Sequence, residues 1–183
     1  MAERKDPWNF VDLEDDPRNT GRQPVGEREV LVDYLDHYRK TLELKCQGLD
    51  AEQLARQAVP PSNLSLLGLV RHLARVERAW FYRTMQHHPD DPKLYWTPEE
   101  PDLDFTGAAG DPAVVEDAWA TWRREVAAAR EFVDAVDSLD AEGAHGGDPI
   151  ALREVLVHLI EEYARHCGHA DLLRECIDGR TGQ

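Results

Sequence analysis

The sequence predicts an all-α protein whose four long helices form a four-helix bundle. Four stretches place apolar residues at three- and four-residue steps, which is the spacing of one face of an α-helix. Longer connections separate these stretches, and we find neither a β-hairpin signal nor an internal repeat between them. Helices that each bury one apolar face pack most simply as a bundle. The chain of 183 residues is long enough to bury such a core without disulfides or a structural metal.

Three segments are expected along the chain. Residues 1–25 predict an extended arm, because Asp, Pro, Asn and Gly are frequent there and interrupt helices. Trp8 and Phe10 stand out in this polar stretch, so we expect the arm to dock on the bundle through its aromatic rings. The bundle itself is expected over residues 26–179, and residues 180–183 are expected to form a short C-terminal tail.

The bundle opens with one long and one short helix. The long helix is predicted over residues 27–47, and Gly48 ends it. Asp50 and Gln53 have the spacing of a capping box, in which each side chain bonds the other residue's backbone N–H. This spacing predicts a short helix over residues 51–57.

The second long helix begins at Ser62 or Ser65, either of which can cap it, and runs to about residue 87. A long connection follows over residues 88–110, and it contains four prolines and three aromatic residues. Connections of this length are unusual in compact domains and are often functional, so we expect this one either to wall a site or to pack its aromatic rings in the core.

Asp-Pro pairs mark the predicted starts of the last two helices. Asp111 can cap the third helix, with Pro112 as its first residue. Asp148 and Pro149 repeat this pattern, so the fourth helix is predicted to begin there and to end at Gly179.

The net charge of −15 argues against two classes of partner. Nucleic acids and anionic membranes are both bound through basic surfaces. No apolar run reaches the roughly 20 residues of a membrane span, and the N-terminus lacks the pattern of a secretory signal. We therefore expect a cytoplasmic protein that binds neither nucleic acid nor membrane.

The three cysteines, Cys46, Cys167 and Cys176, are odd in number and lack CxxC spacing. This argues against a disulfide framework or a zinc knuckle, so we expect reduced thiols. Cys167 follows His166 directly, but no activating arrangement accompanies it, and we expect it to be a packed thiol rather than a nucleophile.

The candidates for a metal site lie on the second and fourth long helices. On a helical wheel of the fourth helix, His166 lies roughly 40° from the centre of the apolar face and Glu162 roughly 80°. His158 and His169 lie further out, at roughly 100–120°. The i, i+4 spacing of Glu162 and His166 lets both side chains converge on one ion. On the second helix, His72 lies at the flank of the apolar stripe and can reach the same edge of the bundle.

Glu77 falls inside the apolar stripe of the second helix. A buried carboxylate must find a partner or change its pKa. Two interpretations stay open: an ion pair with an arginine of another helix, or a group that contacts a ligand or substrate.

These residues stand in two segments that resemble the DinB-like (YfiT-like) superfamily, LSLLGLVRHLARVERAWF at 64–81 and LREVLVHLIEEYARHCGHADLLRE at 152–175. More narrowly, the chain resembles an actinobacterial branch related to mycothiol-dependent maleylpyruvate isomerase and to mycothiol S-transferases. The resemblance implies a four-helix bundle with a divalent metal at one end, held by His72, Glu162 and His166. Many members carry His at the position of Glu162 and Gln at the position of His169.

The resemblance also implies the chemistry. We expect zinc in preference to nickel, iron or manganese, because two histidines and one carboxylate suit zinc with an open position. A low-molecular-weight thiol such as mycothiol is the expected cosubstrate, and its thiolate attacks a small electrophile in an S-transfer or isomerisation. His169 and Glu77 are the candidates for orienting a ligand or moving a proton.

A second class of function stays open beside this enzyme. The bundle can instead be a non-catalytic module that binds a metal or small ligand, or a structural homodimer that pairs through an apolar helix face. Thiol-dependent turnover of an electrophile separates the enzyme from both alternatives.

Overall fold

A computed structural model describes residues 8–182 of the chain. The predictions for residues 1–7, the beginning of the arm, and for Gln183, the end of the tail, lie outside this described part. None of the helices in it is both long and apolar enough to cross a membrane.

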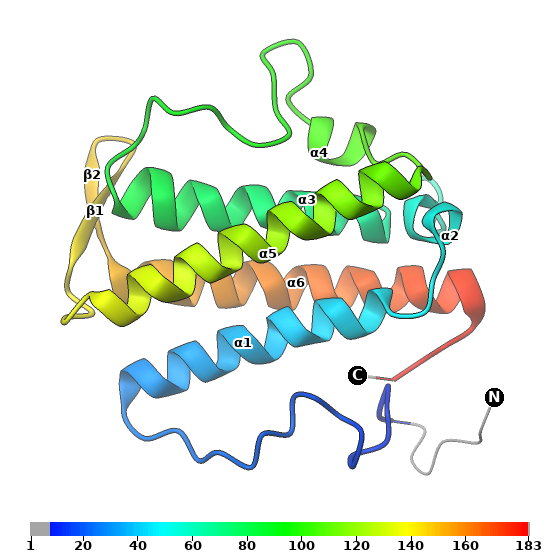
Figure 1. Cartoon of the computed structure of the whole chain (residues 1–183), viewed down its shortest axis with the longest axis horizontal. Helices are drawn as coiled ribbons and strands as arrows, with labels where there is room; N and C mark the ends of the chain where they lie inside the picture. The colour runs from blue at the N-terminus through cyan, green and yellow to red at the C-terminus, as the bar shows by residue number, and fades with distance from the viewer. Residues whose placement is uncertain (1–7, 183) are drawn as a thin grey trace.

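Four long helices form the bundle, as predicted (Figure 1). They are α1 (Glu27–Cys46), α3 (Leu66–Glu77), α5 (Pro112–Ala135) and α6 (Leu152–Asp178). The helix α3 continues without a break into η1 (Arg78–Met85), whose turns are π-helical and therefore wider. The helix α1 packs chiefly against α6, and α3 packs against both α5 and α6. This packing brings α3 and α6, the two helices with the candidate ligands, together.

The caps of three helices explain where those helices begin. The Ser65 side chain accepts a hydrogen bond from the backbone N–H of Gly68, which selects Ser65 over Ser62 as the start of α3. Asp111 caps α5 through the backbone N–H of Ala113, with Pro112 in the first turn. Asp50 and Gln53 form the predicted capping box of α2 (Ala51–Ala55), although this helix is shorter than predicted.

The core lies where the apolar faces of the four helices meet. Leu69 and Leu73 of α3 and Leu152 and Leu159 of α6 are fully buried. Burial of each such side chain contributes about 1.5–3 kcal/mol relative to exposure to water. The apolar faces thus hold α3 against α6 along most of their length, and the polar residues at the edge of this contact keep a defined spacing.

The prediction that the last helix begins at Asp148 and Pro149 is wrong, and so is the absence of a hairpin. Residues Glu142–His145 and Asp148–Ala151 form two antiparallel strands, β1 and β2, and α6 begins only at Leu152. The turn between the strands is Gly146-Gly147, and both glycines have positive φ angles, 61° and 97°. Gly-Gly is a two-residue hairpin signal, because glycine takes these angles without strain.

Close packing of the hairpin on the bundle also depends on glycine. A Cβ atom at Gly143 would lie 2.7 Å from the backbone oxygen of Thr84 and 2.9 Å from the Cα atom of Met85. Only glycine therefore allows β1 to lie directly against the end of η1. The hairpin closes this end of the bundle, on the left in Figure 1.

The long connection between η1 and α5 is held against the helix by arginine side chains, among them Arg75, which donates to the backbone oxygen of Pro101. The Arg71 side chain donates hydrogen bonds of 2.9 Å to the backbone oxygens of Leu103 and Asp104. The Arg71 guanidinium also lies over the ring of Tyr95, 3.9 Å from its centre. These contacts place the short helix α4 (Leu103–Thr106) beside α3 and bring its polar side chains to the edge of the bundle.

The described part of the N-terminal segment starts beside the C-terminal end of the chain and runs below α1 to the start of that helix (Figure 1). Phe10 is fully buried, whereas 80% of Trp8 is exposed. The Lys45 ammonium and the Arg180 guanidinium lie 4.2 and 3.9 Å from the centre of the Phe10 ring. One of the two expected aromatic rings therefore anchors the segment, through cation–π contacts as well as burial.

Candidate metal centre

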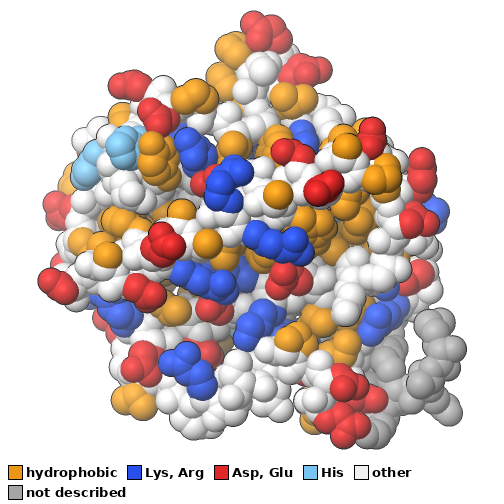
Figure 2. Space-filling view, viewed as in Figure 1, with side chains coloured by type: hydrophobic (Ala, Val, Ile, Leu, Met, Phe, Trp, Pro, Cys, Tyr) orange, Lys and Arg blue, Asp and Glu red, His pale blue; other side chains and the backbone are white. Residues whose placement is uncertain are grey.

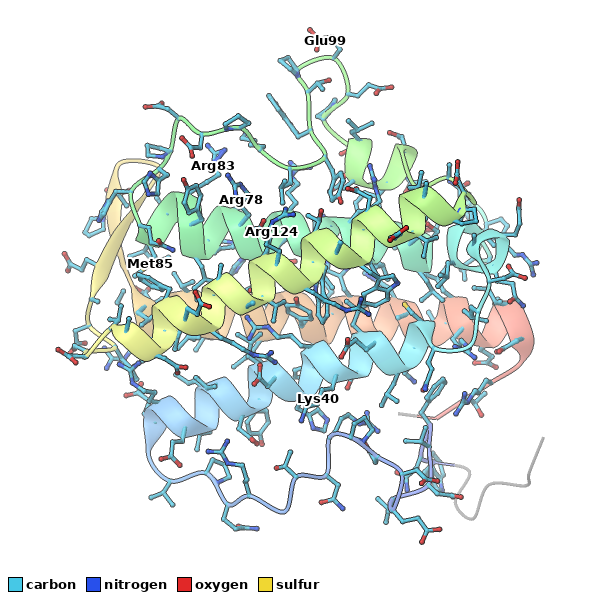
Figure 3. The ribbon with its side chains drawn as sticks, in the orientation of Figure 1. Lys40, Arg78, Arg83, Met85, Glu99 and Arg124 are labelled. Atoms are coloured by element: carbon cyan, nitrogen blue, oxygen red, sulfur yellow. The ribbon has the colours of Figure 1, made fainter. Side chains whose placement is uncertain are left out.

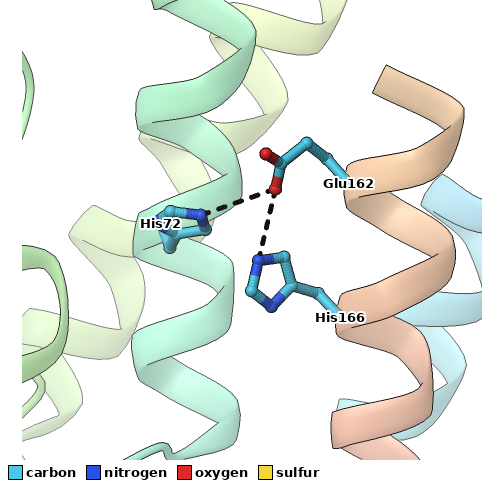
Figure 4. Close-up of side chains that lie close together, drawn as sticks. All are labelled: His72, Glu162 and His166. Carbon is cyan, nitrogen blue, oxygen red and sulfur yellow. Dashed lines mark ion pairs between the residues drawn. The ribbon is translucent and has the colours of Figure 1, made fainter. Parts of the chain in front are cut away.

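Three side chains capable of binding a metal converge between α3 and α6. His72 comes from α3, and Glu162 and His166 lie one turn apart on α6 (Figure 4). One ligand atom from each residue lies within 4.8 Å of the other two. The Oε2 atom of Glu162 is 3.4 Å from Nε2 of His166 and 3.9 Å from Nε2 of His72. The structure therefore brings together the three residues that the sequence singled out.

These separations suit one small cation. Two ligands at about 2.1 Å from a tetrahedral zinc ion lie about 3.4 Å apart. The exposed fractions of the His72 and Glu162 side chains are 22% and 27%, whereas that of His166 is 11%. The group is thus buried on one side and open on the other. Two imidazoles and one carboxylate with an open position form a donor set typical of catalytic rather than structural sites.

The charges of the three residues are already arranged for a cation. The adjacent His166 and His72 rings hold the pKa of Glu162 well below its ordinary value, against the opposing effect of burial. Burial alone would lower the pKa of His72, but its hydrogen bond with Asp104 and the nearby Glu162 carboxylate raise it instead. A divalent cation can take the place of the proton that these carboxylates attract.

Asp104 is the functional residue that sequence reasoning missed. Its Oδ2 atom lies 2.9 Å from Nδ1 of His72 and 3.2 Å from Nη1 of Arg75. The Asp104 side chain is 1% exposed. A carboxylate on Nδ1 leaves Nε2 of His72 free to face the other two ligands and fixes the orientation of the ring. No motif or spacing marks Asp104, because it lies on the irregular connection far from the residue it contacts.

Phe105 packs against the His72 ring. The two rings are stacked, with centroids 5.1 Å apart and an interplanar angle of 24°. The His72 ring also meets the His166 ring edge-on at 4.7 Å. The connection thus contributes a wall to the site, which is one of the two roles that its length suggested.

His169 lies beside the three residues and contacts one of them. Its Nδ1 atom is 3.3 Å from Nδ1 of His166, and its side chain is half-buried. Burial lowers the pKa of His169, and the positive charges of His166 and Arg165 lower it further. A neutral His169 can accept a hydrogen bond from Nδ1 of His166, which leaves Nε2 of His166 facing Glu162.

Glu77 forms an ion pair with an arginine of another helix, which is one of the two interpretations that the sequence left open. Arg39 of α1 donates hydrogen bonds of 2.8 and 2.7 Å to its two oxygens, and Glu77 is fully buried. The Tyr163 hydroxyl donates to the same carboxylate, and Trp122 donates to that hydroxyl, each at 2.8 Å. Burial raises the pKa of Tyr163 well above its ordinary value, so the hydroxyl keeps its proton. This buried network joins all four long helices.

His158 and Cys167 lie close to the site but outside the group of three. His158 is paired with the other Glu162 oxygen, with 3.5 Å between Nε2 and Oε1. Cys167 is buried, and burial raises the pKa of its thiol to about 12. A protonated, buried thiol matches the packed cysteine that the sequence predicted.

The helical bundle is that of the DinB-like class of helical proteins. The sequence profile of the mycothiol-S-transferase family matches residues 30–179, which is most of the chain, and the protein belongs to this DinB/YfiT-like family.

The fold is similar to that of solved structures. Among them is the crystal structure of a conserved protein of locus from Enterococcus faecalis, which superposes with a TM-score of 0.60 at 17% sequence identity. The superposition covers 85% of this chain and 99% of that one. The comparison with curated protein sequences gives no match.

Proposed function

We propose that this protein is a metal-dependent S-transferase that joins the sulfur of mycothiol to a small electrophile. The observation that carries the proposal is the convergence of His72, Glu162 and His166 within 4.8 Å of one another, open on one side. Membership of the mycothiol-S-transferase family supports mycothiol as the thiol.

The donor set favours zinc. Two imidazole nitrogens and one carboxylate oxygen leave a fourth tetrahedral position for a substrate atom. Nickel, iron and manganese accept the same ligands, and iron is common in two-histidine, one-carboxylate sites. When bound, a divalent ion lowers the pKa of a thiol that reaches it, so that the thiol is a thiolate at neutral pH.

Different residues of the chain bind the metal and orient its ligands. His72, Glu162 and His166 are the ligands, and Asp104 holds the Nδ1 proton of His72 so that Nε2 stays turned inwards. His169 supports His166 in the same way through the contact between their Nδ1 atoms. The thiolate, whose proton has passed to solvent, uses a sulfur lone pair to form a bond to the electrophilic carbon. In a substitution, the electrons of the bond between that carbon and the leaving group depart with the leaving group. In an addition, the π electrons of the double bond move to its far end, which takes a proton from solvent. Glu77 stays in its ion pair with Arg39 and holds the two helices in place.

Metal content is the direct test. We expect about one zinc ion per chain in the purified protein, and a folded His166→Ala variant that has lost it. Glu162 and Glu161 offer a matched pair, since Glu161 is exposed and paired with Arg165 on the outer face of the same helix. Glu162→Gln should lose most of the metal, whereas Glu161→Gln should keep it, with circular dichroism as the control for folding.

The activity assay then separates the enzyme from its alternatives. Mycothiol-dependent consumption of an electrophile by the wild type, lost in His166→Ala, supports the transferase. Metal bound without turnover leaves a non-catalytic binding module. Absence of metal after incubation with zinc, nickel and iron salts overturns the proposal and leaves a structural bundle. The homodimer and the cytoplasmic location stay predictions, which sedimentation and cell fractionation test.

A further inference from the structure

A second feature with the composition of a binding site lies beside the metal centre. A cavity of about 340 Å³, open to solvent, is lined by the end of α3, by η1, by the connection after it and by the tip of the β-hairpin. This volume falls within the roughly 300–1,000 Å³ typical of small-molecule sites. Figure 3 shows Arg78 and Arg83 projecting from the helix towards the connection, and Figure 2 shows Lys and Arg side chains gathered on this face.

The cavity is basic, although the chain carries a net charge of −15. Its lining includes Arg75, Arg78, Arg83 and Lys93, together with His145 from the hairpin. No Asp or Glu stands among the described residues that line it. Four cations around one cavity repel one another, so an arrangement of this kind is stabilised by an anion.

The contacts of two of these cations leave their charge uncompensated. Arg83 donates to the backbone oxygens of Pro89 and Asp91, which are neutral acceptors that anchor the connection. The Lys93 ammonium lies over the Trp96 ring, 4.3 Å from its centre. Both contacts fix the position of a positive charge at the wall of the cavity without cancelling it.

The Arg78 guanidinium is only partly paired with other side chains. Its Nη1 atom lies 3.6 Å from the carboxylate of Glu125, but Arg124 lies closer to that carboxylate, at 2.9 Å. Its Nε atom is buried and has no hydrogen-bond partner among the described residues. Because this Nε atom is closed to solvent, the donors that Arg78 can offer to the cavity are those of its Nη groups, and the guanidinium is held over the Tyr82 ring, 4.4 Å from its centre.

Arg75 connects the cavity to the metal centre. Its Nη1 atom shares the Oδ2 atom of Asp104 with His72, and the Arg75 side chain also lines the cavity. A molecule held in the cavity therefore lies next to the helix that carries His72. Arg75 thus relates an anion in the cavity to the residues around His72.

We propose that this basic cavity binds the carboxylate or phosphate group of the electrophile. The part of this proposal that gives the cavity a role in catalysis rests on the proposed transferase function. The part that makes the cavity a binding site for a small anion rests only on the residues that line it. Guanidinium groups bind both kinds of anion through paired N–H donors, and the cavity offers three of them.

Calorimetric titration of the full chain with inorganic phosphate and with succinate tests the site. At about 0.1 M ionic strength, we expect saturable binding of at least one anion, weakened by added sodium chloride. The anion that binds more tightly shows whether the cavity prefers a phosphate or a carboxylate group. Arg78→Gln and Lys93→Gln should each weaken binding about tenfold, because each removes a charged donor. Arg56→Gln changes an exposed arginine that directly follows the short helix α2 at the other end of the bundle, and it should leave binding within about twofold.

A variant of the metal centre separates this proposal from the proposed function. His166→Ala should keep the anion affinity while it loses the metal. Equal binding in Arg78→Gln, Lys93→Gln and Arg56→Gln would overturn the proposal, as would loss of anion binding in His166→Ala alone, since the anion would then occupy the metal centre. Failure of both anions to bind at about 10 mM would overturn it as well. Failure of thiol transfer with intact anion binding would refute only the catalytic role.

Discussion

Nδ1 of His72 lies 2.9 Å from Oδ2 of Asp104, and this contact ties the long connection of the bundle to its candidate metal centre. His72 stands on a regular helix, whereas Asp104 stands on the single turn α4, held in place by Arg71. Burial alone would raise the pKa of Asp104, but the hydrogen bond with His72 and the charge of Arg75 lower it. Asp104 therefore stays ionised and presents a charged acceptor to the histidine.

Asp104→Asn should weaken metal binding by about 10–100-fold, the usual effect of removing the partner of a metal-bound histidine. The fold should persist, because the amide fits the same space. Competition with a chromogenic chelator measures the affinity. Asp102→Asn, an exposed carboxylate on the same turn, is the matched control and should bind metal like the wild type. An unchanged affinity in Asp104→Asn would show that the contact is structural only.

Metal affinity should fall as the pH is lowered through a value above the ordinary histidine pKa of about 6.5. The pKa of His72 is raised in the metal-free protein, so protons compete with the metal over a higher pH range than for a free histidine. The pKa of Glu162 is held low, so this carboxylate does not contribute to the loss near neutral pH. Metal affinity measured between about pH 5 and 8 gives the pH at which the loss of affinity is half complete.

The raised pKa of His72 also makes the stability of the metal-free protein depend on pH. In the metal-free protein, the raised pKa of His72 stabilises the fold below the pKa of the unfolded chain, and this contribution is lost as the pH rises through the folded value. Asp104→Asn removes the main cause of the raised pKa and should move the midpoint of metal binding to lower pH. A midpoint that stays in place would assign the titration to another group.

Glu77→Gln should destabilise the protein by about 3–5 kcal/mol, because it removes the fully buried carboxylate that pairs with the Arg39 guanidinium and leaves only the partly exposed Asp36 as its counter-charge. Tyr163→Phe should cost less, about 1–3 kcal/mol, because it removes one hydroxyl between Trp122 and Glu77. Urea denaturation measures both. Glu116→Gln, at an exposed position on α5, should change stability by less than about 0.5 kcal/mol. A Glu77→Gln variant as stable as this control would contradict a structural role for the ion pair.

One thiol per native chain should react rapidly with Ellman's reagent at pH 8. Cys176 is exposed, whereas burial raises the pKa values of Cys46 and Cys167 to about 12. At pH 8 the thiolate of such a group is populated on the order of one part in ten thousand, and the thiolate is the reactive form. All three should react in denaturant, and Cys176→Ser should abolish the fast phase. Rapid reaction of a second native thiol would contradict the burial of Cys167 or Cys46.

The helices and half of the site could be predicted because their signals are local. Asp111 and Pro112 start α5 through contacts within one turn, and the i, i+4 spacing of Glu162 and His166 is set by the geometry of a single helix. Asp148 and Pro149 carry the same local signal as Asp111 and Pro112, yet they lie in a strand. There the Gly146-Gly147 turn and the close approach of Gly143 to η1 favour a hairpin over a helix start.

The sequence by itself determined the four amphipathic helices, most of their caps and the pair of ligands on α6, because each depends on residues a few positions apart. Only the tertiary structure decided how closely His72 approaches this pair, that Asp104 supports it, and that four cations surround one cavity. Those contacts join residues tens of positions apart, and they depend on how the apolar faces pack and on how Arg71 fixes an irregular connection. Periodicity carries no signal for such contacts, since it reports the orientation of a side chain on its own helix and not the neighbour that it meets.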